Sequence, residues 1–206
     1  MCIDKEIIFT HQNGNEFIPL KICTFNAQGL TNKFAQFKDF IFQHNPDILV
    51  VTETHFNEDV LNSEFCPPGY VCFRKDRKLH FYTEGTYTQS NRGGVLILVK
   101  SFLNPTPYTE GDVDAEILWV NINPQPKVSW LIGGCYRTEE DEEQILTKIN
   151  SYIDKINTDN CILLGDFNLR RVDWEAQTSS RALDQSFIDT VSENLLHQIV
   201  SEPTRG

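Results

Sequence analysis

The sequence has no long apolar run, and no stretch approaches the ~20 consecutive apolar residues that a transmembrane helix requires. The first residues include Asp4, Lys5 and Glu6, where a signal peptide would have its apolar core. Internal repeats, low-complexity tracts and linker-like segments are also missing. We therefore expect a soluble, intracellular protein without membrane contacts.

The chain contains six cysteines, but they form no C-x-x-C pair and no Cys/His spacing of the kind that binds zinc. Cys23, Cys135 and Cys161 each lie within an apolar run, where a cysteine usually behaves as a small buried hydrophobic residue. This pattern favours six free thiols in a reducing compartment over a disulfide framework or a zinc site.

Basic residues are few, since 18 Lys and Arg stand against 29 Asp and Glu and give a formal net charge of −11. This total mildly disfavours a general nucleic-acid binder, because such proteins usually have basic surfaces. Four basic residues nevertheless cluster in residues 74–78 (RKDRK), followed by His80 and Arg92. The cluster, with Arg77 and Lys78, is compatible with phosphate contacts and at least as well with a solvated loop.

With 206 residues, of which 40% are apolar and 23% charged, the chain can form one domain with its own core. Short apolar runs alternate with amphipathic segments, which is typical of an α/β protein. We expect strands at residues 21–25, 47–52, 95–100, 116–122, 128–135 and 161–165, and helices at 31–45, 139–156 and 182–196.

The expected strands between residues 95 and 135 follow one another without a helix, which predicts antiparallel pairing within this stretch. Helices on both sides of this β-rich middle favour a layered sandwich over a doubly wound sheet. The helices are expected to bury periodic apolar stripes. These are Phe34, Phe37 and Ile41 in the first, Ile145, Ile149, Tyr152, Ile153 and Ile156 in the second, and Leu183, Phe187, Val191 and Leu195 in the third.

Polar side chains follow three of the expected strands directly. Asn26 follows residues 21–25, Glu53 follows 47–52, and Asp166 and Asn168 follow 161–165. Carboxylates and amides at such places suit a hard cation, or an attacking water together with a phosphate oxygen. Each also has an ordinary alternative: a turn cap for Asn26, a solvated strand end for Glu53, and an Asx-turn for the last pair.

Five motifs occur in the order found in the endonuclease/exonuclease/phosphatase family, which the chain resembles. They are FNAQGL around Asn26, TETH around Glu53, RGGVLILVK from Arg92, CYR at Tyr136 and LLGDFN at Asp166. The CYR motif and the closing LHQIVSEPTRG are most similar to the apurinic-type endonuclease domain of non-LTR retrotransposon polyproteins. Any one motif is weak, but five in order over residues 21–206 are specific.

The resemblance implies an α/β fold with four layers, α/β/β/α, in which two mixed β-sheets are flanked by helices. It places the domain at residues 19–206, after an N-terminal extension at 1–18. It also implies that Glu53 is the main ligand of Mg²⁺ (or Mn²⁺) and that Asn26 lies beside the metal. Tyr136 would hydrogen-bond a phosphate oxygen, while Asp166 and Asn168 would orient the attacking water. The residues expected near the DNA substrate are Thr204, Arg92, Arg77 and Lys78.

One departure from the family pattern concerns its last motifs, an Asp-containing strand and a Ser-Asp-His sequence, neither of which occurs in the 206 residues. We therefore expect the last strands of the sandwich to be missing and the catalytic activity of this polypeptide to be weak or absent. His55, two residues after Glu53, invites a zinc interpretation, but packing in the core or at the rim is favoured.

Three functions remain open. The family resemblance favours a monomeric, Mg²⁺-dependent endonuclease that nicks DNA in the nucleus, as part of a retrotransposon polyprotein with a downstream reverse transcriptase. The missing Ser-Asp-His motif favours a non-catalytic remnant that binds only metal or nucleic acid. A phosphatase or phosphodiesterase acting on phosphoinositides or sphingomyelin is disfavoured by the CYR and EPTR sequences.

Overall fold

The computed structural model describes residues 5–13, 16–77, 92–109, 116–125, 128–137, 146–147, 150–151, 153 and 160–199, with backbone only before residue 19. The chain divides into two compact units, which are described one at a time. The first contains residues 1–109, 116–136 and 160–166, and the second contains 110–115, 137–159 and 167–206. No helix among the described residues is long and apolar enough to cross a membrane.

The first unit contains a mixed five-stranded sheet with the order β1-β2-β3-β5-β4. Its strands are β1 (Lys5–Asn13), β2 (Glu16–Asn26), β3 (Ile48–Thr52), β4 (Tyr70–Lys75) and β5 (Val95–Lys100). Strands β2 and β3 are parallel, and the other neighbouring pairs are antiparallel. Strand β1 lies within the segment that the resemblance assigned to an N-terminal extension; where the domain begins stays a prediction.

The second sheet of this unit is also mixed, has four strands and follows the order β6-β7-β8-β9. Its strands are β6 (Thr106–Pro107), β7 (Ile117–Gln125), β8 (Val128–Tyr136) and β9 (Cys161–Asp166). Strands β7 and β8 pair antiparallel as expected, and β8 and β9 are parallel. The expectation was wrong for β5, which pairs with β3 and β4 in the other sheet.

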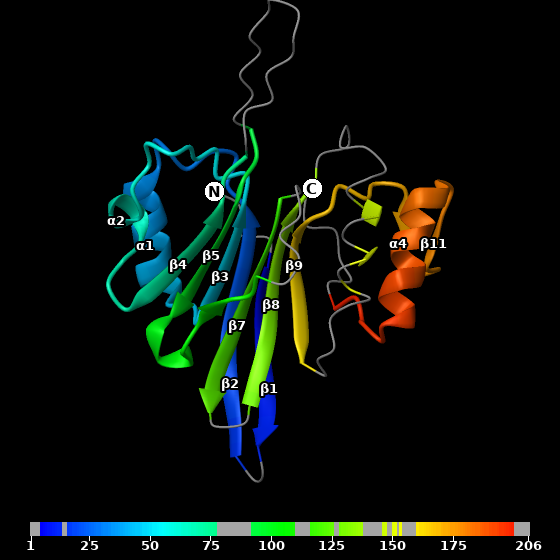
Figure 1. Ribbon diagram of the computed structural model, residues 1–206, viewed down its shortest axis with the longest axis horizontal. Helices are drawn as coiled ribbons and strands as arrows, with labels where there is room; N and C mark the ends of the chain where they lie inside the picture. The colour runs from blue at the N-terminus through cyan, green and yellow to red at the C-terminus, as the bar shows by residue number, and fades with distance from the viewer. Residues whose placement is uncertain are drawn as a thin grey trace, which may run out of the picture. The chain divides into compact units, whose positions relative to one another are not determined.

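The two sheets enclose one apolar core, and the five-stranded sheet covers a second core with its other face. Because successive strand residues point to opposite faces, Ile48 and Val50 contribute to the first core and Leu49 and Val51 to the second. The second core is closed by α1 (Phe34–His44) and α2 (Asn62–Phe65), beside the sheet in Figure 1. The mixed α/β fold with two mixed sheets is therefore confirmed.

Helix α1 is shorter than the expected helix 31–45 and buries a slightly different face. Its buried residues are Phe37, Phe40 and Ile41, while Phe34 is half-buried against the same core. The helix ends at Asn45, which adopts a left-handed conformation with φ 45°, directly before Pro46. A short 3₁₀ helix, η1 (Ser101–Leu103), follows β5 and buries Leu103.

The second unit contains α4 (Ala182–Glu193) and a small antiparallel pair, β10 (Val172–Asp173) and β11 (Thr178–Ser179). Helix α4 buries Phe187 as expected, together with Asp184, Ile188 and Thr190. Leu183 and Val191 of the expected stripe are half-buried. The expectation was wrong for Leu195, which is exposed because the helix ends before it.

Most of the expected helix 139–156 lies outside the described residues. Its described members are helical, and Ile153 is buried as expected. Leu146, which was not in the expected stripe, is also buried. Asn150 is buried as well and donates a hydrogen bond from Nδ2 to Ser186 Oγ of α4 at 3.2 Å.

Strand β9 depends on a glycine at its penultimate position. Gly165 has a φ of +145°, and a Cβ built there would lie 1.8 Å from the carbonyl oxygen of Cys135 on β8. Gly69 also has a positive φ, +88°, but has no atom within 4 Å of a built Cβ.

We expect Gly165→Ala to lower the free energy of unfolding by about 3 kcal/mol or more, because the β8–β9 pairing must shift. Gly69→Ala is the control, and its backbone strain alone should cost about 1 kcal/mol. Urea titrations of both variants measure the difference. Equal losses would show that β9 tolerates a side chain at this position.

Candidate active site

Four polar side chains converge at the carboxyl ends of two parallel strand pairs, one in each sheet. Asn26 ends β2 and Glu53 follows β3, next to Asn26 in the register Asn26↔Thr52. Tyr136 ends β8 and Asp166 ends β9, paired in the register Tyr136↔Asp166. Because parallel strands end at the same sheet edge, each pair brings two polar side chains to one place.

The Asn26 amide joins the two sheets at this place. Its Nδ2 donates to Glu53 Oε1 at 2.6 Å and to Asp166 Oδ2 at 2.9 Å. Its Oδ1 accepts the backbone N–H of Gln28 at 3.0 Å, which fixes the orientation of the amide. The structure thus brings together three of the side chains that the sequence indicated.

Tyr136 completes this cluster by donating its hydroxyl to Glu53 Oε1 at 3.0 Å. Burial is the largest cause that raises the pKa of Tyr136, and the charge of Glu53 and its hydrogen bond to the hydroxyl raise this pKa further. The Arg77 guanidinium, 5.6 Å from the centre of the Tyr136 ring, opposes this shift of the pKa. The hydroxyl therefore keeps its proton at neutral pH and acts as a hydrogen-bond donor.

The backbone that carries Glu53 adopts a conformation that is unusual for residues other than glycine. Glu53 has φ 52° and His55 has φ 56°. The neighbouring segment holds this turn, since Gly29 N donates to Glu53 O at 2.8 Å and Leu30 N donates to Thr54 O at 2.9 Å. Strained residues persist only where their surroundings fix them, and they concentrate at functional sites.

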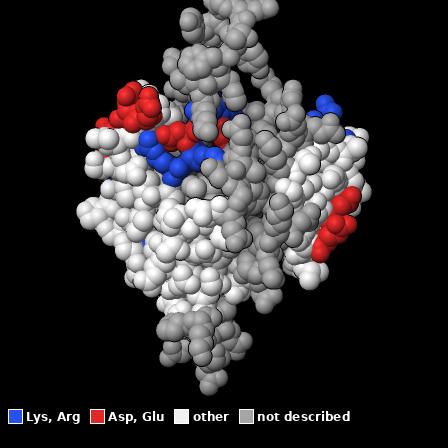
Figure 2. Space-filling model, in the orientation of Figure 1, with Lys and Arg blue, Asp and Glu red and all other residues white. Residues whose placement is uncertain are grey.

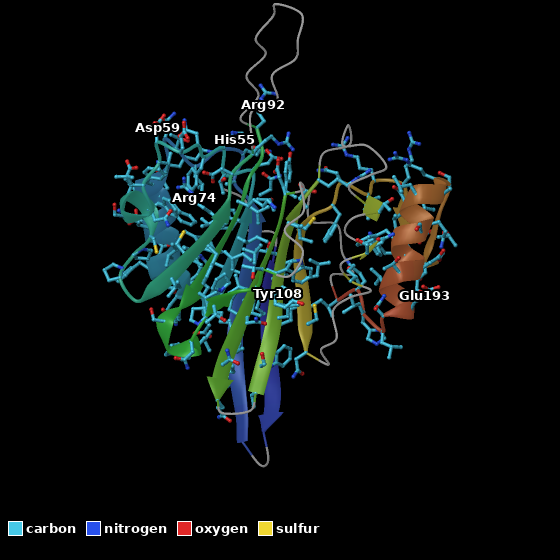
Figure 3. All side chains as sticks on the ribbon, viewed as in Figure 1. His55, Asp59, Arg74, Arg92, Tyr108 and Glu193 are labelled. Atoms are coloured by element: carbon cyan, nitrogen blue, oxygen red, sulfur yellow. The ribbon has the colours of Figure 1, made fainter. Side chains whose placement is uncertain are left out.

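His55 lies beside Glu53, with 3.7 Å between His55 Nε2 and Glu53 Oε2. Burial lowers the pKa of His55, the Glu53 charge opposes this, and the charges of Arg92, Lys33 and Arg77 lower it further. His55 and Arg92 are labelled in Figure 3 at the upper ends of the five-stranded sheet. From the sequence we expected His55 to pack in the core or at its rim. The signal for its contact with Glu53 was that the two residues are two positions apart.

Asn168 belongs to the second unit, where it is hydrogen-bonded to Arg137. Asn168 Nδ2 donates to the Arg137 carbonyl at 2.5 Å, and Arg137 Nη1 donates to the carbonyls of Phe167 at 2.9 Å and Asn168 at 3.4 Å. Asn168 itself has φ 49°. The buried Arg137, the last residue of CYR, was missed by sequence reasoning and fixes the loop that follows Asp166. The water-orienting role of Asn168 stays a prediction.

The expected basic loop is only partly a loop. Arg74 and Lys75 end β4, an edge strand on which charged residues are well tolerated. Arg74 forms an ion pair with Asp76 Oδ2 at 2.8 Å. It also donates hydrogen bonds to the carbonyls of Val60 and Asn57. Figure 2 shows basic and acidic side chains intermingled above the upper ends of this sheet.

The other expected substrate contacts differ in their surroundings. Arg77 Nε pairs with Glu116, whereas Arg92 is exposed. Lys33 Nζ, not singled out from the sequence, donates to the carbonyls of Ala27 at 3.0 Å and Gln28 at 3.2 Å and lowers the pKa of His55. Lys78, His80 and Thr204 lie outside the described residues.

The cluster offers two carboxylates, Glu53 and Asp166, that share one amide donor. Within the part of the chain that the structure describes, no group of three or more His, Cys, Asp and Glu residues could hold a metal ion. This donor set is poor for zinc. It fits Mg²⁺, which uses one or two carboxylates and completes its shell with waters and substrate phosphates. For Asn26 to be a ligand as well, its amide would have to turn, because Nδ2 rather than Oδ1 faces the two carboxylates.

Comparison with solved structures shows the same fold in several nucleases. The endonuclease domain of TRAS1, a telomere-specific non-LTR retrotransposon, is 19% identical with a TM-score of 0.61, covering 90% of this chain and 75% of that one. A 3′ phosphatase, NExo, from Neisseria bound to a product DNA hairpin is 15% identical with a TM-score of 0.59, covering 85% and 71%. An AP endonuclease from Leishmania major is 17% identical with a TM-score of 0.58, covering 84% and 66%.

Among curated proteins, the RNA-directed DNA polymerase from mobile element jockey of Drosophila melanogaster is 25% identical over 156 residues. The match covers 75% of this chain but only 15% of that relative. The model of the endonuclease/exonuclease/phosphatase family matches residues 23–198, which include Asn26, Glu53, Tyr136 and Asp166. The chain therefore belongs to the endonuclease/exonuclease/phosphatase family.

Proposed function

We propose that this chain is a Mg²⁺-dependent, DNA-nicking endonuclease domain of a non-LTR retrotransposon polyprotein. The observation that carries the proposal is the Asn26–Glu53–Tyr136–Asp166 cluster, built from the ends of two parallel strand pairs. The similarity to the TRAS1 endonuclease domain and to the jockey polymerase supports the retrotransposon context. In that context the domain acts as a monomer in the nucleus, upstream of a reverse transcriptase.

In the proposed reaction, water displaces one ester oxygen of a DNA phosphodiester. Glu53 would hold the cation, which neutralises charge that develops on the phosphate. Asp166, which accepts a hydrogen bond from Asn26, would orient the attacking water and take up its proton as a base. The protonated Tyr136 hydroxyl and the Asn26 amide are donors that can turn to the phosphate oxygens. Asn168 would assist Asp166 in holding the water.

The cationic side chains around Glu53 suit a polyanionic substrate despite the acidic net charge. The pKa of His55 is lowered by the charges of Lys33, Arg77 and Arg92. These three cations therefore lie near the TETH turn, which is formed by residues 52–55. With Lys78 and Thr204, which the sequence indicated, they would contact the DNA backbone. Such contacts position DNA without reading its sequence.

We expect the wild-type chain to bind Mg²⁺ or Mn²⁺ weakly and Glu53→Gln to lose most of this binding. Gln is isosteric and can still accept hydrogen bonds from Asn26 and Tyr136, so the fold should be retained. Glu193→Gln, the same change on the exposed surface of α4, is the control and is labelled in Figure 3. Isothermal titration calorimetry compares metal binding by the three proteins. Equal binding heats for all three would show that Glu53 is not the metal ligand.

The second prediction concerns nicking of supercoiled plasmid by residues 1–206. The 206 residues contain no Ser-Asp-His sequence, and loss of one positioned acid/base group typically slows a reaction ~10²–10⁴-fold. We therefore expect slow nicking with Mg²⁺, none with EDTA, and none by Asp166→Ala. Fast nicking abolished by Asp166→Ala would show that the described cluster suffices; nicking that survives EDTA or Asp166→Ala would contradict the proposal.

The third prediction concerns DNA affinity. Arg92→Ala should weaken binding of duplex DNA at low salt and reduce the slope of log affinity against log salt by about one, the value for one phosphate contact. The matched variant is Lys38→Ala, which removes one positive charge from the exposed face of α1. Fluorescence anisotropy over a salt series gives both slopes, and indistinguishable slopes would remove Arg92 from the DNA interface.

A further inference from the structure

Glu116, directly before β7, has both of its carboxylate oxygens engaged. Oε1 accepts a hydrogen bond from Arg77 Nε, and Oε2 accepts the backbone N–H of Gly94 at 2.6 Å. The Arg77 and Glu116 side chains are only 18% and 12% exposed, so solvent screens their ion pair weakly. A charge pair of this kind fixes geometry, because either partner alone would be left buried and uncompensated.

The two glycines of the RGG motif leave the space that this ion pair needs. A Cβ at Gly93 would lie 2.5 Å from Arg77 Nε and 2.7 Å from both oxygens of Glu116. A Cβ at Gly94, whose φ is +92°, would lie 2.5 Å from Thr54 Oγ1. The motif therefore does more than present Arg92, since it brings the start of β5 against both the ion pair and the TETH turn.

One route leads from Glu116 to Glu53 through the backbone of these glycines. Glu116 accepts from Gly94 N, the Gly94 carbonyl accepts from Thr54 N at 3.5 Å, and the Gly93 carbonyl accepts from His55 N at 2.8 Å. Thr54 and His55 are the residues that follow Glu53 in its strained turn. Glu116 thus holds the strand start to which this turn is bonded.

A second route leads through Arg77 and Tyr136. The Arg77 guanidinium lies 5.6 Å from the centre of the Tyr136 ring, within the range of a cation–π interaction. The Tyr136 hydroxyl in turn donates to Glu53 Oε1. Because Glu116 pairs with Arg77, it also acts on Glu53 through the Tyr136 ring.

We propose that Glu116 is a positioning residue for the metal-binding site. Its carboxylate pairs with Arg77 and accepts a hydrogen bond from Gly94 N. These two contacts fix the backbone segment that carries Glu53 and the ring that carries the Tyr136 hydroxyl. This inference rests on the proposed function. Glu116 does not touch the metal or the substrate, so its effect passes through Thr54, His55 and Tyr136.

The backbone route is tested without metal by hydrogen–deuterium exchange. Glu116→Gln should speed exchange of the Thr54 and His55 amides, while amides in α1 keep their wild-type rates. Asp47→Asn is the matched control, because Asp47 also accepts a backbone N–H, from Lys21 at 2.8 Å, and pairs with a cation, Lys100 Nζ at 2.9 Å. It lies before the opposite end of β3 and should leave the TETH amides unchanged.

The Tyr136 route is tested by Mn²⁺ affinity in a double-mutant cycle. Glu116→Gln should weaken Mn²⁺ binding about tenfold, in the range found for residues that orient metal ligands. In the Tyr136→Phe background, which keeps the ring but removes its hydrogen bond to Glu53, the further loss should be clearly smaller than tenfold, because only the backbone route through Thr54 and His55 remains. Asp47→Asn should bind Mn²⁺ like the wild type.

Several outcomes would overturn the proposal. They are unchanged exchange at Thr54 and His55 in Glu116→Gln, unchanged Mn²⁺ affinity, or the same tenfold loss with and without the Tyr136 hydroxyl. If Glu116→Gln does not fold, Arg77→Gln replaces it, because Glu116 then keeps its hydrogen bond to Gly94. Normal Mn²⁺ affinity in Arg77→Gln would equally reject the proposed role of the Arg77–Glu116 pair. Absence of Mn²⁺ binding in the wild type would instead reject the proposed function, and exchange would still decide the hold on the TETH turn.

Discussion

The candidate site depends on one side-chain amide that carries two hydrogen bonds. Asn26 Nδ2 reaches Glu53 on its own sheet and Asp166 on the other, at 2.6 Å and 2.9 Å. Two carboxylates brought this close repel each other, and a shared donor lowers that cost in the absence of a cation. The orientation of the amide is fixed in turn by Gln28 N, so the turn after β2 sets the geometry of a site made by two sheets.

The apolar packing beneath this amide keeps the two sheets in register. Ile48, Val50 and Ile97 of one sheet and Ile132 and Leu164 of the other belong to one buried core. That core leaves the strand ends where polar side chains can meet. The cost of holding Glu53 and His55 at positive φ is offset by the hydrogen bonds of the segments on either side, which include Gly29 and Gly93.

Much of this arrangement could be predicted from the sequence because it is encoded locally. Asn26, Glu53 and Asp166 could be placed at strand ends, since each follows an apolar run directly. Pairing between distant strands could not be predicted in the same way. Nothing in VLILVK itself tells whether β5 joins β3 or β7, because a fully buried strand is apolar on both faces.

Contacts between side chains that lie far apart in the sequence could not be predicted from the sequence either. Glu116 reads as an ordinary strand start, and only the folded chain brings it to Arg77 and Gly94. Arg137 reads as a solvated cation after a strand, yet it is buried and holds the loop around Asn168. Periodicity also misplaced Leu195, because a helical stripe does not show where the helix ends.

The bond between Asn26 and Asp166 joins residues that are 140 positions apart in the chain. The amide is made early in synthesis and its distant carboxylate late, an interval of roughly 10 s at ordinary rates of elongation. Contacts of such long range also form slowly, because a large loop must close before they contribute stability. A nascent chain that already contains Asn26 and Glu53 therefore has no assembled site, and this topology delays formation of the four-residue cluster until both sheets are made.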